Sequence, residues 1–154
     1  MVKRACISDI ASLTALRVEF LREDCGELSE EVTGKLKESL PVYFEKNLNR
    51  SIFCYLIREA EAVVACAFLL VVEKPANPMF ITGKTGTVLN VYTKPAFRRK
   101  GYGKALMEAL LQDAAEMNLS SVDLEATEDG YDLYKSVGFK DYASKYRTMK
   151  WDNK

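Results

Sequence analysis

The stretch Phe97–Leu111, FRRKGYGKALMEALL, places two glycines among basic residues directly before a strongly helical pattern. The first turn of a helix has free backbone N–H groups and a partial positive charge, so it attracts anions. Gly101 and Gly103 carry no Cβ and would let an anion approach those N–H groups closely. The surrounding cations, which can bind phosphate oxygens, are Arg98, Arg99, Lys100 and Lys104. Together these residues predict a site for a phosphate or a diphosphate.

Common nucleotide-binding motifs do not fit this chain. The dinucleotide fingerprint requires a third glycine three residues after the second, where this sequence has Leu106. The tripeptide GKT at 83–85 looks like the end of a P-loop, but Pro78 stands where that motif needs its first glycine. A nucleotide-binding protein of either kind is therefore disfavoured.

The composition is that of an ordinary globular domain. The chain has 154 residues, 48% of them hydrophobic, which fits a single domain over residues 1–154. Lys plus Arg and Asp plus Glu both number 22, so neither nucleic acid nor an anionic membrane is expected as a partner. The N-terminus lacks the apolar core of a signal peptide, and no apolar run is long enough to span a bilayer. We therefore expect a cytoplasmic protein.

Cysteine and histidine content bears on redox and metal chemistry. Cys6, Cys25, Cys54 and Cys66 show no C-x-x-C spacing, and three of them lie in apolar, strand-like contexts. We expect reduced thiols in the core rather than disulfides. The chain contains no histidine, which disfavours a zinc site and removes every mechanism that depends on an imidazole. No metal is expected.

The helices that must position the glycine-rich stretch follow from hydrophobic periodicity and capping residues. Helices are expected from Ser8 to Gly26 and from Ser29 to Leu48, with a kink or a break at Pro41. A third helix should run from the glycines to about Met117, and a short fourth helix should span residues 131–137.

The strands complete the expected architecture. They are expected over residues 2–6, 51–59, 62–74, 87–93 and 120–127, with a final hairpin or pair of strands within 139–151. Few polar residues separate 51–59 from 62–74, which predicts an antiparallel hairpin. The order is β-α-α-β-β-β-α-β-α-β-β, an α/β (α+β) arrangement in which a mixed sheet carries helices on its faces.

Three sequence elements together resemble the GNAT superfamily of N-acetyltransferases. The first is the R-x-x-G-x-G pattern of Arg98, Gly101 and Gly103, which lies between a predicted strand and a long helix. The others are ATEDG at 126–130 and LYKSVGF at 133–139. The likeness in element order covers most of the chain, and it is specific from residue 86 to residue 139.

The resemblance implies a fold and a donor. The family has a mixed, mostly antiparallel sheet with a splay between strands four and five, and its R-x-x-G-x-G loop binds the diphosphate of acetyl-CoA, a co-substrate. Carried over, the pantetheine arm would lie in the splay against the backbone of Val91, Tyr92 and Thr93. A backbone N–H near Val91 or Tyr92 would hold the acetyl oxygen. The implied diphosphate-binding residues are Arg98, Arg99, Lys100, Gly101, Tyr102, Gly103 and Lys104.

Tyr134, in LYKSVGF, stands where the family keeps its general acid. A phenol with an ordinary pKa of about 10 can protonate a thiolate whose conjugate acid has a pKa of about 8.5. The alternative is a structural tyrosine packed beside Leu133 and Phe139. The resemblance favours the catalytic interpretation.

The acceptor side is less clearly marked. Without a histidine, the incoming amine would lose its proton through water, helped by Glu19, Glu23 or Glu125, each of which is also readable as a solvated surface carboxylate. Asn90 alternates with its strand neighbours and could point toward the acceptor. Aminoglycosides, polyamines, amino acids, small toxic amines and protein N-termini all stay open as acceptors.

The implied function is transfer of an acetyl group from acetyl-CoA to a primary amine by direct attack in a ternary complex, with a small-molecule acceptor favoured. The alternative is a non-catalytic acyl-CoA-binding or regulatory module on the same fold. Tyr134 argues against that alternative, because binding alone needs no phenol. The C-terminal strands could also pair between two subunits, as in some relatives, to form a homodimer.

Overall fold

The computed structural model describes the whole chain, from Met1 to Lys154, and contains one five-stranded sheet with the strand order β1-β2-β3-β4-β5. The strands are β1 (Val2–Arg4), β2 (Ile52–Glu59), β3 (Ala62–Glu73), β4 (Lys84–Thr93) and β5 (Ser121–Asp123). The neighbours from β1 to β4 are antiparallel, and β5 pairs with β4 in parallel. The predicted mixed, mostly antiparallel sheet and its β2–β3 hairpin are confirmed.

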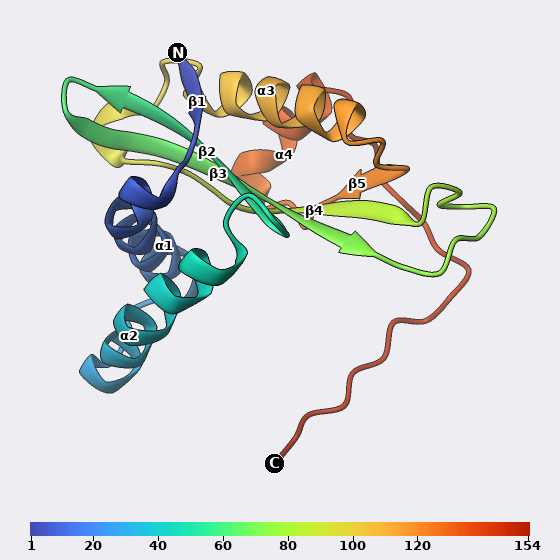
Figure 1. Ribbon diagram of the computed structural model, residues 1–154, viewed down its shortest axis with the longest axis horizontal. Coiled ribbons are helices and arrows are strands. Elements are labelled where there is room, and N and C mark those ends of the chain that lie inside the picture. The colour runs from blue at the N-terminus through green and yellow to red at the C-terminus, as the bar shows by residue number, and fades with distance from the viewer.

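Helices cover both faces of the sheet, as Figure 1 shows. On one face lie α1 (Ile10–Cys25) and α2 (Glu30–Asn47), and on the other lie α3 (Tyr102–Glu116) and α4 (Glu128–Ser136). Residues 95–97 form a short 3-10 helix in the connection from β4 to α3. The chain therefore reverses direction between β4 and α3 within a compact loop.

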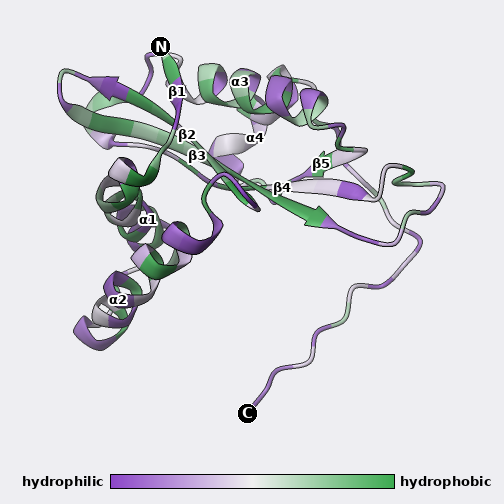
Figure 2. Cartoon of the chain, in the orientation of Figure 1, coloured by the Kyte–Doolittle hydropathy of each residue, from purple (hydrophilic) through white to green (hydrophobic).

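Separate apolar clusters fill the two layers. Because side chains alternate along a strand, the same strands contribute to both clusters. On the α1–α2 side, Leu16 and Phe44 pack with Phe68 of β3. On the α3 side, Leu106 packs in a cluster with Leu69, the next residue of β3. Figure 2 accordingly shows β2 and β3 as mainly hydrophobic, which is expected of strands covered on both faces.

The first helix begins differently from the sequence-based expectation. Ser8 does not cap it but lies in a short 3-10 helix, residues 7–9. The carboxylate of Asp9 accepts a hydrogen bond from the Cys6 N–H at 2.9 Å, which caps the 3-10 helix, whereas α1 itself begins without a side-chain cap. Gly26, with a φ of 82°, follows the last residue of α1, as predicted.

The second helix begins as predicted but does not break. The hydroxyl of Ser29 accepts a hydrogen bond from the Val32 N–H at 3.2 Å. The helix then continues through Pro41 to Asn47 as one element, although proline removes one backbone donor. Phe44, one turn later, is almost completely buried, so tertiary packing holds the helix together beyond the proline.

The predicted splay lies between β4 and β5. Thr85–Thr87 of β4 pair with Ser121–Asp123 of β5, and β4 then continues to Thr93 without a strand on that side. The second half of β4 therefore has a free backbone edge facing a gap, which is where an extended ligand could lie beside it.

The predicted C-terminal strands are wrong. The segment 139–154 contains no helix or strand and extends away from the domain, as Figure 1 shows. Its large side chains, including Tyr142, Tyr146 and Trp151, are exposed. The segment has residues that suit a strand, but β5 is only three residues long and offers little edge for a continuing ladder.

The cysteines only partly match the expectation. Cys54 and Cys66 are buried in the sheet, as predicted, whereas Cys6 and Cys25 are exposed, and all four are free thiols. None of the helices combines the length and the apolar character needed to cross a membrane.

Candidate active site

A bulge in β4 marks the start of the gap. The register between β3 and β4 shifts between Cys66 and Phe68, and Asn90, on the opposite strand, has a φ of 55°. Asparagine tolerates this left-handed conformation better than most residues. Because a bulge bends a strand and turns its side chains, it sets the direction of the β4 edge that faces the gap.

The Asn90 side chain is buried and hydrogen-bonded through both of its polar atoms. Its Oδ1 accepts from Arg17 Nη1 at 3.2 Å, and its Nδ2 donates to Cys66 Sγ at 3.3 Å. Burial raises the pKa of Cys66 to about 12, so this thiol is protonated near pH 7 and is a poor nucleophile.

A cavity of about 80 Å³ lies where β4 and β5 diverge. Its lining residues are Phe20, Val88, Leu89, Asn90, Val91, Leu124, Glu125, Thr127 and Tyr134. It brings together Asn90, Glu125 and Tyr134, which the sequence suggested for separate reasons.

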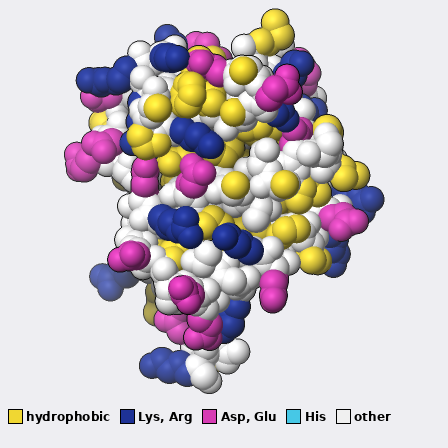
Figure 3. Space-filling view, turned by 90° about the vertical axis from the view of Figure 1, so that its left-hand side faces the viewer, with side chains coloured by type: hydrophobic (Ala, Val, Ile, Leu, Met, Phe, Trp, Pro, Cys, Tyr) yellow, Lys and Arg dark blue, Asp and Glu magenta, His cyan; other side chains and the backbone are white.

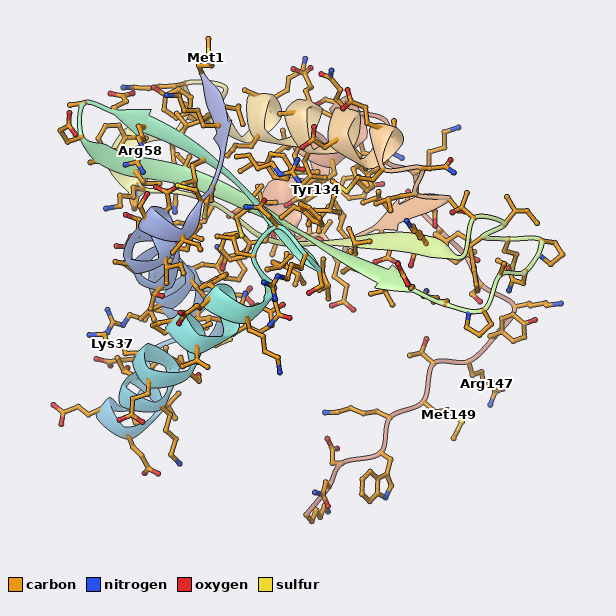
Figure 4. The ribbon with its side chains drawn as sticks, viewed as in Figure 1. Met1, Lys37, Arg58, Tyr134, Arg147 and Met149 are labelled. Atoms are coloured by element: carbon orange, nitrogen blue, oxygen red, sulfur yellow. The ribbon has the colours of Figure 1, made fainter.

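Tyr134 reaches this cavity from α4, between that helix and the sheet (Figure 4). Its ring packs edge-on against Phe139, with centroids 6.1 Å apart. A Cβ on Gly130 would lie 2.9 Å from Tyr134 Cε2, so only glycine leaves room for the ring there. Burial is what raises the pKa of Tyr134 above its usual value, and no side-chain hydrogen bond contributes to the shift. It is a proton donor available to a ligand.

The glycine-rich loop presents free backbone donors at the other end of the gap. None of the N–H groups from Arg99 to Lys104 donates to a group of the protein. Arg99 and Gly101 have φ values of 69° and 81°, and α3 begins directly after Gly101. Consecutive N–H groups in such a turn at a helix start form a binding site for an anion.

The loop cations are mostly engaged with carboxylates. Arg98 Nη2 lies 2.8 Å from both carboxylate oxygens of Glu23 on α1. Lys100 Nζ lies 3.0 Å from Glu59 Oε1 at the end of β2, and the Tyr102 hydroxyl donates to the same oxygen. These contacts fasten the loop to β2 and α1.

The remaining loop cations differ in their surroundings. Lys104 has only a distant partner, Glu108, at 3.9 Å. Arg99 takes part in no ion pair of the chain, which leaves it the cation most available to a bound anion.

Gly103 has a structural role that the sequence did not suggest. A Cβ at this position would lie 3.0 Å from Cδ2 of Leu133 on α4. Glycine here lets α3 and α4 approach each other, in addition to leaving its N–H open. By contrast, a Cβ at Gly101 would meet nothing within 4 Å, so its positive φ is what favours glycine there.

Neighbouring side chains at the end of β4 face opposite sides of the sheet. Val91 lines the cavity, whereas Tyr92 is buried toward α1, with its hydroxyl 3.4 Å from Glu23 Oε1. Burial, together with Glu23, raises the pKa of Tyr92 to about 12. The Thr93 carbonyl accepts a hydrogen bond from Arg98 Nε at 2.8 Å, so the strand end and the loop are joined.

The carboxylates suggested as helpers occupy different places. Glu125 lines the cavity and makes no ion pair, whereas Glu23 is held by Arg98. Glu19 lies 3.8 Å from Lys94. No group of three or more cysteine, aspartate, glutamate or histidine side chains is arranged to hold a metal ion.

Arg17 is a site residue that the sequence reasoning missed. It lies on α1 and donates to Asn90, next to the bulge. A signal was present: Arg17 comes four residues after Leu13 and three before Phe20, so it falls within the apolar row of the helix. A charge in that row predicts a side chain that faces the sheet.

A sheet that opens between parallel strands, a helix start with free N–H groups at one end of the gap and a phenol lining the gap are the features expected of an acyltransferase site. The comparisons agree: the acetyltransferase (GNAT) family matches residues 16–139. The match covers most of the chain, and the protein therefore belongs to the acetyltransferase (GNAT) family.

Solved structures share the fold. A predicted acetyltransferase from Clostridium acetobutylicum, determined with acetyl-CoA, has a TM-score of 0.84 and 24% identity, over 97% of this chain and 95% of that one. A GCN5-related N-acetyltransferase from Ralstonia eutropha JMP134 has a TM-score of 0.79 and 26% identity, over 97% of both chains. A ribosomal-protein-alanine N-acetyltransferase from Brucella melitensis biovar Abortus 2308 has a TM-score of 0.67 and 21% identity, over 97% of this chain and 99% of that one.

Proposed function

We propose that this protein transfers an acetyl group from acetyl-CoA to the primary amine of a small molecule, by direct attack in a ternary complex. The observation that carries the proposal is Tyr134, which lines the cavity where β4 and β5 diverge and whose buried hydroxyl is held by no other side chain. A pure binding module would have no use for a proton donor at that point.

Donor binding would rely on the backbone. The free N–H groups from Arg99 to Lys104 fit a diphosphate, and the open edge of β4 at Val91, Tyr92 and Thr93 fits an extended amide-containing arm. Arg99 and Lys104 supply the nearest available positive charge. The relative from Clostridium acetobutylicum was solved with acetyl-CoA, which supports the same donor here.

The chemistry would then need few side chains. A backbone N–H near Val91 or Tyr92 stabilises the oxyanion as the amine nitrogen bonds to the carbonyl carbon. The carbon–sulfur bond breaks, and Tyr134 gives its proton to the thiolate. The proton of the amine leaves through water, assisted by Glu19, Glu23, Glu125 or Asn90. The protonated state of Cys66 supports direct attack rather than an acetyl-cysteine step.

Calorimetric titration with acetyl-CoA and an assay of free CoA release over a panel of primary amines test this proposal. We expect acetyl-CoA to bind and to raise the melting temperature, since a ligand that binds only the folded state stabilises it. We also expect at least one amine to accelerate CoA release. Binding without acceleration by any amine would favour the non-catalytic acyl-CoA-binding module.

A homodimer is the partner arrangement that we propose for this enzyme. The exposed aromatic side chains of residues 139–154, such as Tyr142, Tyr146 and Trp151, support it, because a second copy would cover them. Sedimentation equilibrium of the full chain and of a chain ending at Lys140 tests it: the full chain should be dimeric and the shortened chain monomeric. Four free cysteines support a reducing, cytoplasmic location.

A further inference from the structure

A second, larger cavity lies on the other side of the β4 bulge. Its volume is about 240 Å³, and it lies between α1, α2 and the sheet. The apolar part of its wall consists of Leu40, Phe44, Ile52, Phe68 and Leu89. Cavities that take drug-sized ligands measure roughly 300–1,000 Å³, so this one suits a group the size of an amino acid side chain.

The polar part of the wall is formed by Arg17 and Tyr43. Arg17 is half-buried, and none of the ion pairs of the chain includes it. Its one hydrogen bond goes to Asn90 Oδ1, so most of its N–H donors have no acceptor. Burial lowers its pKa, but a guanidinium remains charged at neutral pH. Asp24 and the ring of Phe20, 5.8 Å from Arg17 Cζ, offset part of this charge, but no carboxylate lies within ion-pair distance, so an anionic ligand could bind the free donors.

The two cavities meet at the bulge. Leu89 lines both of them, and Asn90 lines the smaller cavity while it accepts a hydrogen bond from Arg17. A molecule with an anionic group at Arg17 and an apolar group in the larger cavity would therefore place the atoms between them near the cavity that Tyr134 lines. An α-amino acid has this arrangement, because its amine and its carboxylate are attached to the same carbon.

We propose that the acceptor is a free α-amino acid with a large apolar side chain. Arg17 binds its carboxylate through paired N–H donors, the apolar cavity holds its side chain, and its amine enters the cavity that Tyr134 lines. This inference rests on the proposed acetyl transfer. It also argues against polyamines and aminoglycosides, whose several positive charges Arg17 would repel.

The test compares matched acceptors that differ in the carboxylate, with concentrations expressed as the unprotonated amine, because the carboxylate also lowers the pKa of the amine. The pairs are L-phenylalanine with 2-phenylethylamine, L-leucine with 3-methylbutylamine, and L-methionine with 3-(methylthio)propylamine. The readout is kcat/KM from free CoA release. We expect at least one amino acid to exceed its decarboxylated partner by tenfold or more, because the amine alone cannot use Arg17.

Variants of Arg17 test whether this residue causes the preference for the amino acid over its decarboxylated partner. Arg17→Met keeps the apolar stem but removes the charge, and the preference should fall toward unity through a higher KM for the amino acid. Arg22→Met changes an exposed arginine of the same helix and should keep the preference. Arg17→Lys retains a charge without the paired N–H geometry of arginine and should keep part of the preference for the amino acid. Thermal unfolding checks that each variant is folded.

A purely structural role for Arg17, through Asn90, would lower turnover of both members of a pair equally and leave their ratio unchanged. That result would overturn the inference, as would faster turnover of the decarboxylated amines or no turnover of any amino acid in the panel. Calorimetry with acetyl-CoA separates this failure from failure of the proposed function. Binding of acetyl-CoA with turnover of other amines removes only the amino acid acceptor, whereas absence of binding removes acetyl transfer itself.

A further variant tests the apolar part of the site. Leu40→Phe adds volume to the wall of the larger cavity. It should raise KM for L-phenylalanine more than for L-alanine, whose side chain does not need the space. An equal change for both amino acids would show that the side chain does not occupy this cavity.

Discussion

At the α3 end of the gap, the groups free to bind a ligand are mainly backbone N–H groups, whereas on the α1–α2 side they belong to one side chain, Arg17. The loop from Arg98 to Lys104 has free backbone donors, and Arg98 and Lys100 are held by Glu23 and Glu59. Arg17 has the opposite character, with a charged side chain that forms no ion pair and donates one hydrogen bond, to Asn90. Binding of acetyl-CoA should therefore tolerate most side-chain substitutions in the loop, whereas binding of the acceptor should be sensitive to substitution of Arg17.

The largest effect is expected from Tyr134→Phe, which removes the phenol that lines the cavity between the two regions. Loss of general-acid catalysis should lower kcat by roughly 10²–10⁴-fold. Acetyl-CoA affinity by calorimetry should stay within about threefold, because the phenol acts mainly in the transition state. Tyr131→Phe, on the same helix but hydrogen-bonded to Asp141, is the matched control and should retain activity. Near-normal turnover of Tyr134→Phe, with chemistry rate-limiting, would refute the general-acid role.

The next effect concerns the backbone of the donor region. Gly103→Val should weaken acetyl-CoA binding by about tenfold or more, because a Cβ would lie over the helix start. It should also lower the free energy of unfolding by about 1–3 kcal/mol, since that Cβ would lie only 3.0 Å from Leu133 Cδ2.

A double variant separates these two consequences. Gly103→Val with Leu133→Ala relieves the contact between α3 and α4, and it is compared with Leu133→Ala alone. If affinity stays low while the added valine no longer reduces stability, the open N–H groups are what Gly103 provides. Recovery of affinity together with stability would mean that Gly103 serves packing alone.

The pH dependence of kcat/KM tests whether the acceptor amine or a group of the enzyme controls the rate. Without histidine, kcat/KM should rise about tenfold per pH unit toward the pKa of the acceptor amine. Burial raises the pKa of Tyr134, so its acid form persists to higher pH and the falling limb should lie above about pH 10. Two acceptors with amine pKa values about one unit apart should shift the rising limb by about one unit. A rising limb fixed near neutrality for both would identify an enzyme base, with Glu125 the first to replace.

The smallest effect should come from a loop side chain. Arg99→Gln removes the loop cation that has no carboxylate partner, and acetyl-CoA affinity should fall by about two- to fivefold at low salt. The difference should shrink as ionic strength rises, because exposed charges are screened. Lys37→Gln, an exposed position on α2, is the control (Figure 4). A hundredfold loss for Arg99→Gln would contradict the idea that the backbone dominates donor binding.

The parts that the sequence predicted well depend on local signals. Gly101 directly precedes α3 and Gly103 is its second residue, and Tyr134 lies on the short helix α4, which ends shortly before Gly138. Glycine at a turn and apolar residues at helical spacing indicate the local backbone conformation from the sequence alone. These elements could therefore be placed without knowledge of the rest of the fold.

The parts that the sequence did not predict depend on distant partners. Glu23 and Glu59 hold Arg98 and Lys100 from 75 and 41 residues away, which no spacing rule anticipates. Arg17 meets Asn90 across 73 residues. The segment after Phe139 has residues suited to a strand, but a strand also needs an edge to pair with, and that depends on the length of β5.

The carboxylates around the glycine-rich loop also affect how a ligand arrives. Glu23, Glu59 and Glu108 offset the fields of Arg98, Lys100 and Lys104, and Figure 3 shows acidic and basic side chains interspersed over the face that α1, α2 and the loop region present. Because the chain as a whole is also neutral, little long-range attraction reaches a diffusing anion. Capture of a highly charged donor should therefore proceed without electrostatic steering, at about 10⁵–10⁶ M⁻¹ s⁻¹ if it follows unsteered association. The selectivity of the loop would then act only at contact, after collision, when the N–H groups of Arg99 to Lys104 meet the phosphate oxygens.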